Sequence, residues 1–296
     1  MECSIPPAGS KSLSRNPSKT LLINPINTNS SAKSLLRPII RRTVSLVESV
    51  AGFRTDPTGW LPNRLEMLIG TYEKPLMRSL RRVLPKSGVL VDIGANVGFI
   101  CRQIAESFPE ARVFAFEPNP RIYPILRANL KGFSNCQLFN VGLGATEGRL
   151  EFFHGKESSV GSFVPAYASQ HPSNSSGGQI TKSIVRVTTG DALLSQIETV
   201  DVMKIDVEGY EMEVLKGMSN LLSKGVIRTV FFEFCPFAQR WAHKQPRDII
   251  DLLVESGYTI YELEGEWEGS RVSAEDIGAL IAKLGNRGYT TLRASR

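Results

Sequence analysis

Short apolar runs alternate with amphipathic segments along most of the chain from residue 89 onward. The apolar runs have the length of buried strands and cover 89–93, 112–116, 137–143, 201–205, 229–234 and 258–263. Between them, apolar positions three and four residues apart predict helices over 97–107, 120–131, 210–218 and 246–256. Apolar strands that alternate with amphipathic helices predict an α/β fold, a Rossmann-like, doubly wound, mostly parallel sheet with helices on both faces.

The first 88 residues show a different pattern. Residues 1–34 are rich in Ser, Asn, Pro and Lys and have little periodicity, which predicts a disordered basic tail. Helical spacing over 35–50 and again over 65–84 predicts an N-terminal helical extension at 35–88, ahead of one α/β domain at 89–296. Two arginines lie beside the first apolar stripe, so a membrane-surface helix is an alternative to a helix that packs on its own domain.

A long insertion interrupts the alternation. Strand patterns at 149–153 and 184–188 flank a Ser- and Gly-rich stretch, 154–183. About 30 residues exceed an ordinary connection, so we expect either a lid near the functional site or plain disorder, and favour the lid.

Composition excludes several classes of protein. The chain has 296 residues and a net charge of +6 that is concentrated in its N-terminal part. No apolar run is long enough for a spanning helix, and no secretory signal is apparent. The four cysteines form no CxxC and the three histidines no HxxxH, so we expect no disulfide framework, no metal site and a reducing, cytoplasmic location.

A glycine-containing turn follows the first predicted strand, with the sequence DIGANVG at 92–98. In a doubly wound sheet, ligands bind where strands end at the topological switch point. Gly94 and Gly98 allow a tight turn and a close approach of a ligand to the backbone. The segment is not GxGxxG, which weakens a dinucleotide site.

Acidic residues end three of the predicted strands. Glu117 follows the second strand, where an acid can accept hydrogen bonds from both ribose hydroxyls of a nucleoside. Asp206 and Glu208 follow the 201–205 strand, and Glu233 lies near the end of 229–234. Such carboxylates can hold a cationic group, a substrate hydroxyl or a divalent ion, or act as a base. We therefore expect an adenosine-containing cofactor at this edge, with its reactive end near the second group of acids.

Three segments together resemble the FkbM-type family of class I S-adenosylmethionine-dependent methyltransferases. They are VDIGANVG at 91–98, FEPNP at 116–120 and KIDVEGYE at 204–211, and VTTGDALL at 187–194 also resembles the family. The resemblance covers about 70–259. It implies a Rossmann-like methyltransferase domain, S-adenosyl-L-methionine as cofactor and an antiparallel last strand, for which 289–294 is the candidate.

The resemblance also implies positions for the site residues. The methionine and ribose part of the cofactor would lie among Asp92, Gly94, Ala95, Asn96 and Gly98, with Glu117 on the ribose hydroxyls. Pro118 and Asn119 would lie near the adenine, and Asn140 and Gly142 on its other side. Asp206 would contact both cofactor and acceptor, with Glu208 at the methyl-transfer end. Independently of the resemblance, the place of Glu233 near a strand end makes it a further candidate catalytic acid.

This chain departs from the family pattern at two positions. Tyr210 stands where many members carry His, so a mechanism with a histidine base there is in doubt. Gly142 replaces a small alanine, which is a minor change.

These features predict O-methylation of a hydroxyl on a sugar or other small molecule, with Asp206 or Glu208 positioning or deprotonating it. An NAD-linked oxidoreductase on the same scaffold is one alternative, since Glu117 suits it equally. An RNA-directed methyltransferase is another. The aromatic residues interleaved with basic ones that nucleic-acid binding favours are scarce, so we expect a small-molecule or glycan acceptor.

Overall fold

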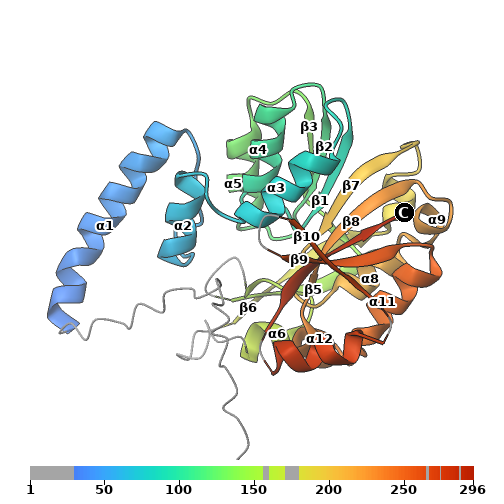
Figure 1. Ribbon diagram of the computed structural model, residues 1–296. Coiled ribbons are helices and arrows are strands. Elements are labelled where there is room, and N and C mark those ends of the chain that lie inside the picture. The colour runs from blue at the N-terminus through green and yellow to red at the C-terminus, as the bar shows by residue number, and fades with distance from the viewer. Residues whose placement is uncertain (1–29, 156–159, 171–179, 265–266, 274, 287) are drawn as a thin grey trace, which may run out of the picture. The chain divides into compact units, whose positions relative to one another are not determined.

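The computed structural model describes residues 30–155, 160–170, 180–264, 267–273, 275–286 and 288–296 (Figure 1). The chain divides into two compact units, 1–45 and 46–296. In the first unit, residues 30–45 form most of helix α1 (Ser30–Ala51), which starts earlier than the pattern over 35–50 predicts. The remainder of the predicted tail, residues 1–29, lies outside the described residues. Among the residues described, none of the helices has both the length and the apolar character needed to span a bilayer.

The second unit contains an eight-stranded sheet within its described residues, ordered β10-β9-β11-β8-β7-β1-β2-β3. Its strands are β1 (Val89–Ile93), β2 (Arg112–Phe116), β3 (Cys136–Phe139), β7 (Val200–Ile205), β8 (Ile227–Phe234), β9 (Thr259–Glu264), β10 (Trp267–Val272) and β11 (Thr290–Ser295). The run from β8 to β3 is parallel, whereas β11 is antiparallel to both β8 and β9. The doubly wound sheet and the antiparallel last strand are therefore confirmed. The chain leaves β1 towards β2 and later returns to β7 on the other side, which places the topological switch point between β1 and β7.

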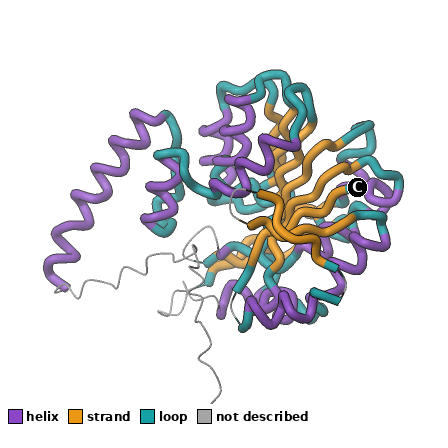
Figure 2. Tube along the Cα trace, in the orientation of Figure 1, coloured by secondary structure: helices purple, strands orange, loops and turns teal. Residues whose placement is uncertain are grey.

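Helices cover both faces of this sheet (Figure 2). One face packs against α3 (Lys74–Val83), α4 (Phe99–Ser107) and α5 (Tyr123–Leu130), with part of α2 (Leu61–Leu68) beside them. The other face packs against α8 (Glu211–Lys216), α9 (Ser219–Ser223), α11 (Pro246–Glu255) and α12 (Ile277–Leu284). The 65–84 segment is thus two helices, and β10, α9 and α12 were not predicted.

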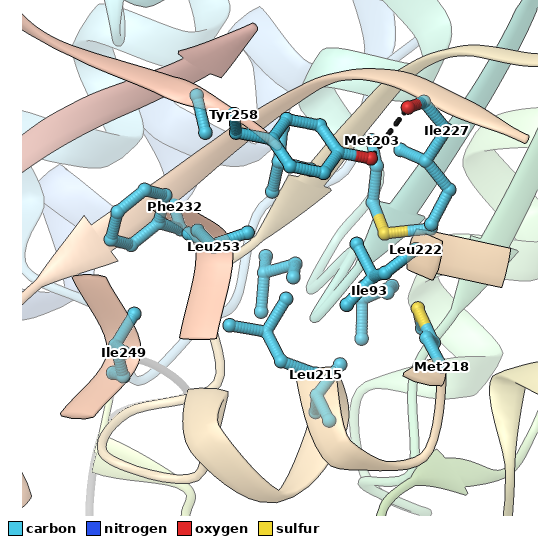
Figure 3. Packing of buried hydrophobic residues seen from close by; sticks show 14 of the residues in the cluster. Ile93, Met203, Leu215, Met218, Leu222, Ile227, Phe232, Ile249, Leu253 and Tyr258 are labelled. Atoms are coloured by element: carbon cyan, nitrogen blue, oxygen red, sulfur yellow. Dashed lines mark hydrogen bonds between the residues drawn. The ribbon is translucent and has the colours of Figure 1, made fainter. Parts of the chain in front are cut away.

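The central strands supply side chains to both cores, which explains their continuous apolar runs. Leu90 and Val202 face the α4 side, whereas Val91 and Met203 face the α8 side. In the second core, the Tyr258 hydroxyl donates a hydrogen bond to the Ile227 carbonyl at 2.6 Å, as Figure 3 shows. Close packing in the two hydrophobic cores, one on each face of the sheet, holds the strand ends in fixed positions.

A smaller sheet contains β4 (Gly142–Leu143), β5 (Gly148–His154) and β6 (Thr181–Thr188), in the order β4-β6-β5. The predicted strand 137–143 was wrong as a single strand, because its two ends belong to different sheets. Between them, the Asn140 side chain donates to the Glu117 carbonyl at 2.8 Å and holds the chain at the turn.

The insertion between β5 and β6 is partly described. Residues 165–170 form helix α6 (Pro165–Gln170), which the sequence pattern did not predict. Residues 156–159 and 171–179, on which much of the predicted lid falls, lie outside the described residues.

Candidate active site

A pocket lies at the carboxyl ends of β1, β2 and β7. Its lining includes Asp92, Gly94, Ala95, Asn96, Glu117, Pro118, Asp206 and Glu208, all of them residues singled out from the sequence. They come from three neighbouring strand ends, so the sheet topology brings together segments that are more than 100 residues apart in the chain.

The glycine turn after β1 leaves no room for side chains at two positions. Gly94 has φ +80°, and a Cβ there would lie 1.9 Å from the carbonyl oxygen of Asp206. Gly98 has φ +84°, and its Cβ would lie 2.6 Å from Leu126 Cδ1. Gly94 thus allows the β1 and β7 ends to touch, and Gly98 allows α4 and α5 to pack closely.

Glu117 is held by the backbone of two adjacent loops. Its Oε2 accepts a hydrogen bond from the Asn96 N–H and its Oε1 from the Asn119 N–H, both at 2.8 Å. Burial raises the pKa of Glu117 to about 7, although these two N–H groups favour the charged form. The carboxylate is therefore fixed in orientation, with its affinity for a proton increased.

Lys204 is a central residue of the site that the sequence analysis did not select. Its Nζ lies 3.4 Å from Asp92 Oδ1 and 3.2 Å from Asp206 Oδ2, and donates to the Gly94 carbonyl at 3.2 Å. Burial alone would lower the pKa of Lys204, but Asp206, Asp92 and Glu73 together raise it well above its usual value. One ammonium thus links the ends of β1 and β7.

Three carboxylates gather beyond Lys204. One oxygen from each of Asp206, Glu208 and Glu233 lies within 4.8 Å of the others. Burial raises the pKa of both Glu208 and Glu233, and the negative charges of their acidic neighbours add to this effect. Glu233 Oε2 is buried without a hydrogen-bond partner.

Glu208 is held in an unusual backbone conformation. Its φ is +56°, and the Ser162 hydroxyl donates to its carbonyl at 2.7 Å. The Tyr167 hydroxyl donates to its carboxylate. Ser162 and Tyr167 both come from the described part of the insertion, so this segment shapes the acidic end of the pocket.

Two further lining residues precede the motifs. Tyr72 and Glu73 come from the loop between α2 and α3, and Glu73 has φ +52°. Burial, and secondarily the nearby Asp206, raises the pKa of Glu73. No sequence pattern marked them, because their position depends on how α3 packs against the sheet.

Other predicted residues lie behind the pocket wall or beside it. Gly98, Asn119 and Asn140 are absent from the described lining, but Asn119 and Asn140 hold Glu117 and its backbone. Gly142 packs under Phe163, whose ring lines the pocket. Glu233 is outside the lining but within the acidic cluster.

The expected nucleoside cofactor fits this arrangement on two observations. Gly94 lines the pocket with backbone alone, so a ligand can approach the chain closely at this point. Asn96 Oδ1, beside the Glu117 carboxylate, is buried without a hydrogen-bond partner. A ribose edge carries the hydroxyl donors that such acceptors need.

Proteins with similar sequences indicate the family of this chain. Residues 92–260 match the model of the FkbM methyltransferase domain. The chain is 30% identical over 190 residues to the hexuronic acid methyltransferase AglP of Haloferax volcanii, which covers 62% of this chain and 69% of that protein.

Two further relatives show the same relationship. The methyltransferase sdnD of Sordaria araneosa is 26% identical over 216 residues, covering 64% of this chain and 81% of its own. The 2-O-methyltransferase NoeI of Sinorhizobium fredii is 27% identical over 176 residues, covering 56% and 70%. The family model covers more than half of the chain, and the chain therefore belongs to the FkbM methyltransferase family and is an S-adenosylmethionine-dependent methyltransferase.

Proposed function

We propose that the enzyme O-methylates a hydroxyl group of a sugar or a related small molecule. The observation that carries this proposal is the cluster of Asp206, Glu208 and Glu233 at one end of the pocket. Carboxylates are hydrogen-bond acceptors, so they suit an acceptor that presents hydroxyl donors. Two relatives support the class, since one is named a hexuronic acid methyltransferase and another a 2-O-methyltransferase.

In this proposal the cofactor binds along the ends of β1 and β2. Glu117 accepts hydrogen bonds from the ribose hydroxyls, and the backbone of Gly94 to Asn96 lies against the rest of the nucleoside. Pro118 borders the adenine side of the pocket. Asn119, Asn140, Gly142 and Gly98 support this wall rather than form it.

When bound, S-adenosylmethionine supplies a methyl group on a positively charged sulfur, which an acceptor oxygen takes by in-line displacement. The protein aligns the two reactants, and alignment can account for about 7–11 kcal/mol of the barrier. The acidic cluster offers negative charge at the end of the pocket where the cationic donor lies.

Glu208 is the proposed base. As the bond from oxygen to the methyl carbon forms, the hydroxyl proton passes to the Glu208 carboxylate, whose raised pKa increases its affinity for a proton. Asp206, paired with Lys204, positions the hydroxyl. Burial, with the charges of Asp206 and Glu211, keeps the pKa of Glu208 high, and Glu208 in turn raises the pKa of Glu233.

An RNA acceptor is disfavoured by the charge of the pocket. Among the described residues, its lining contains one cation, Lys204, against the carboxylates of Glu73, Asp92, Glu117, Asp206 and Glu208. A phosphate backbone would be repelled there. Family membership in turn favours methyl transfer over an NAD-linked oxidoreductase.

We also propose a reducing location such as the cytosol, on the basis of cysteine usage. Cys101, Cys136 and Cys235 are free thiols, as is common in reducing compartments.

The function is tested by incubating the protein with S-adenosylmethionine that carries a deuterated methyl group and a panel of acceptors. The panel contains neutral sugars, hexuronic acids, phenols and a short RNA, and mass spectrometry detects the label. We expect gain of one labelled methyl on a sugar hydroxyl. Labelling of the RNA alone, or of an amine alone, would contradict the proposal.

A further inference from the structure

A second groove, with a volume of about 510 Å³, lies beside the proposed active site. Its walls come from the segment entering α6, the turn that precedes α8, and the end of helix α10 (Pro236–Trp241). The site described above uses none of these walls except through Phe163. The volume is within the range of small-molecule sites in proteins, about 300–1,000 Å³.

The groove adjoins the active site. Phe163 lines both spaces. Glu208 lines the active site, and the next two residues, Gly209 and Tyr210, line the groove. The Phe163 and Tyr210 ring centroids are 4.8 Å apart. The two spaces thus lie on either side of Phe163, next to each other along the segment 208–210.

The aromatic wall of the groove is fixed in place. The Trp241 ring lies 5.0 Å from that of Phe237 and 6.0 Å from that of Tyr167, in edge-to-face contacts. Tyr167 also donates to the Glu208 carboxylate, so one side chain contacts both Trp241 and the proposed base. Trp241 remains only partly buried, and its ring lines the groove.

The polar part of the groove is electrically balanced, unlike the active site. Lys244 Nζ lies 2.8 Å from Glu213 Oε1, and both residues line the groove. The groove thus offers aromatic faces together with the ammonium donors of Lys244 and the carboxylate acceptors of Glu213. A pyranose ring has the matching chemistry, since it presents apolar C–H groups on its faces and hydroxyls around its edge.

We propose that this groove binds the sugar adjacent to the methylated one, so that the acceptor is an oligosaccharide or glycoconjugate with a neutral pyranose at that position. The inference rests on the proposed function. Trp241 and Tyr210 contact the faces of the second ring, and Lys244 and Glu213 bind its hydroxyls. A free monosaccharide occupies only the active site.

The test measures binding by ligand-observed saturation-transfer NMR in the presence of S-adenosylhomocysteine. The probes are cellobiose, maltose, N,N′-diacetylchitobiose and α-1,3-mannobiose, each compared with its own monosaccharide. We expect at least one disaccharide to bind about tenfold more tightly than its monosaccharide. Trp241→Ala abolishes this difference, whereas Trp241→Phe retains most of it.

Two further variants keep the test valid if Trp241→Ala folds poorly. Lys244→Gln, at the groove edge, reduces the disaccharide advantage several-fold, and Ile184→Ala, on an exposed position of β6, leaves it unchanged. The inference is overturned if no disaccharide binds more tightly than its monosaccharide, or if the advantage survives in both Trp241→Ala and Lys244→Gln.

Methyl transfer, measured separately, distinguishes the two ideas. If monosaccharides are methylated and no disaccharide binds more tightly, the proposal of a second sugar site is wrong and the proposed function stands. If disaccharides bind more tightly but no sugar is methylated, the proposed function is wrong and the sugar-binding groove stands.

Discussion

Asp92 and Lys204 are register partners on the adjacent parallel strands β1 and β7, and Lys204 Nζ lies 3.4 Å from Asp92 Oδ1. Both side chains are buried. The same ammonium also contacts Asp206 and the Gly94 carbonyl. One cation therefore links the carboxyl ends of β1 and β7, the two strands that flank the topological switch point. The geometry of the pocket floor depends on this arrangement.

We expect Lys204→Met to destabilise the fold strongly. Asp92 would keep its buried charge without a cation, and breaking a buried pair in this way costs about 3–5 kcal/mol. Lys182→Met is the matched control, because Lys182 and its partner Glu151 are about half exposed and such pairs contribute about 0–1 kcal/mol. Urea unfolding of both variants measures the difference, and equal losses would contradict this view of the pocket floor.

Gly94→Ala should damage both stability and cofactor binding. The new Cβ would lie 1.9 Å from the Asp206 carbonyl oxygen at a φ that L residues rarely adopt, so the two strand ends must separate. A loss of about 2–3 kcal/mol is expected, with weaker S-adenosylhomocysteine binding in calorimetry. Gly148→Ala, where a Cβ meets nothing within 4 Å, should leave both unchanged. If the two variants behaved alike, the close approach of β1 and β7 would be wrong.

Glu117 should make the stability of the ligand-free protein depend on pH. Because burial raises its pKa to about 7, the folded state holds a proton that the unfolded state releases near pH 4.5. Stability is then lost as the pH rises from about 4.5 to about 7, with a slope of up to about 1.4 kcal/mol per pH unit from this group. Glu117→Gln should reduce the slope in unfolding measurements between pH 5 and 8, and an unchanged slope would argue against the raised pKa.

The same group should couple cofactor binding to pH. Ribose hydroxyls donate to the ionised carboxylate, so affinity for S-adenosylhomocysteine rises as the pH increases through about 7. Below that pH the affinity should fall by up to about tenfold per pH unit. Calorimetry from pH 5.5 to 8.5 tests this, with Glu117→Gln expected to bind weakly at every pH. Affinity that falls as the pH rises would place the ribose elsewhere.

Glu208→Gln should reduce turnover while the cofactor still binds. Loss of a base lowers kcat by about 10²–10⁴-fold, and the rise of kcat with pH should disappear with it. Asp206→Asn should lower kcat as well, through poorer positioning of the hydroxyl. In both variants S-adenosylhomocysteine affinity should stay within a few-fold of wild type, as it should for the surface control Glu151→Gln. Wild-type turnover in both acid variants would remove these roles.

The doubly wound, mostly parallel sheet and the main pocket could be predicted because they follow from local patterns. The run of residues 89–93 is apolar except for Asp92 because β1 is buried on both faces, and the glycines after it are required by close contacts with Asp206 and Leu126. Glu117, Asp206 and Glu208 follow apolar strands, so parallel pairing alone brings them to one edge.

Other parts of the site depend on tertiary contacts that no local pattern encodes. Tyr72 and Glu73 reach the pocket only because α3 packs on the sheet. The position of Lys204 could have been predicted from the sequence. Alternation along β7 places it on the same face of the sheet as Val202, and Leu90 and Asp92 of β1 lie on that face too. The split between β3 and β4 escaped prediction because Phe139, Val141 and Leu143 keep the two-residue spacing of a single strand across the turn.

The most direct test of the account is a crystal structure of the complex with S-adenosylhomocysteine. We predict that the ribose hydroxyls bind Glu117, that the nucleoside lies against Gly94 to Asn96, and that the sulfur points towards Asp206 and Glu208. A nucleoside bound elsewhere, or a sulfur that points away from these acids, would contradict it.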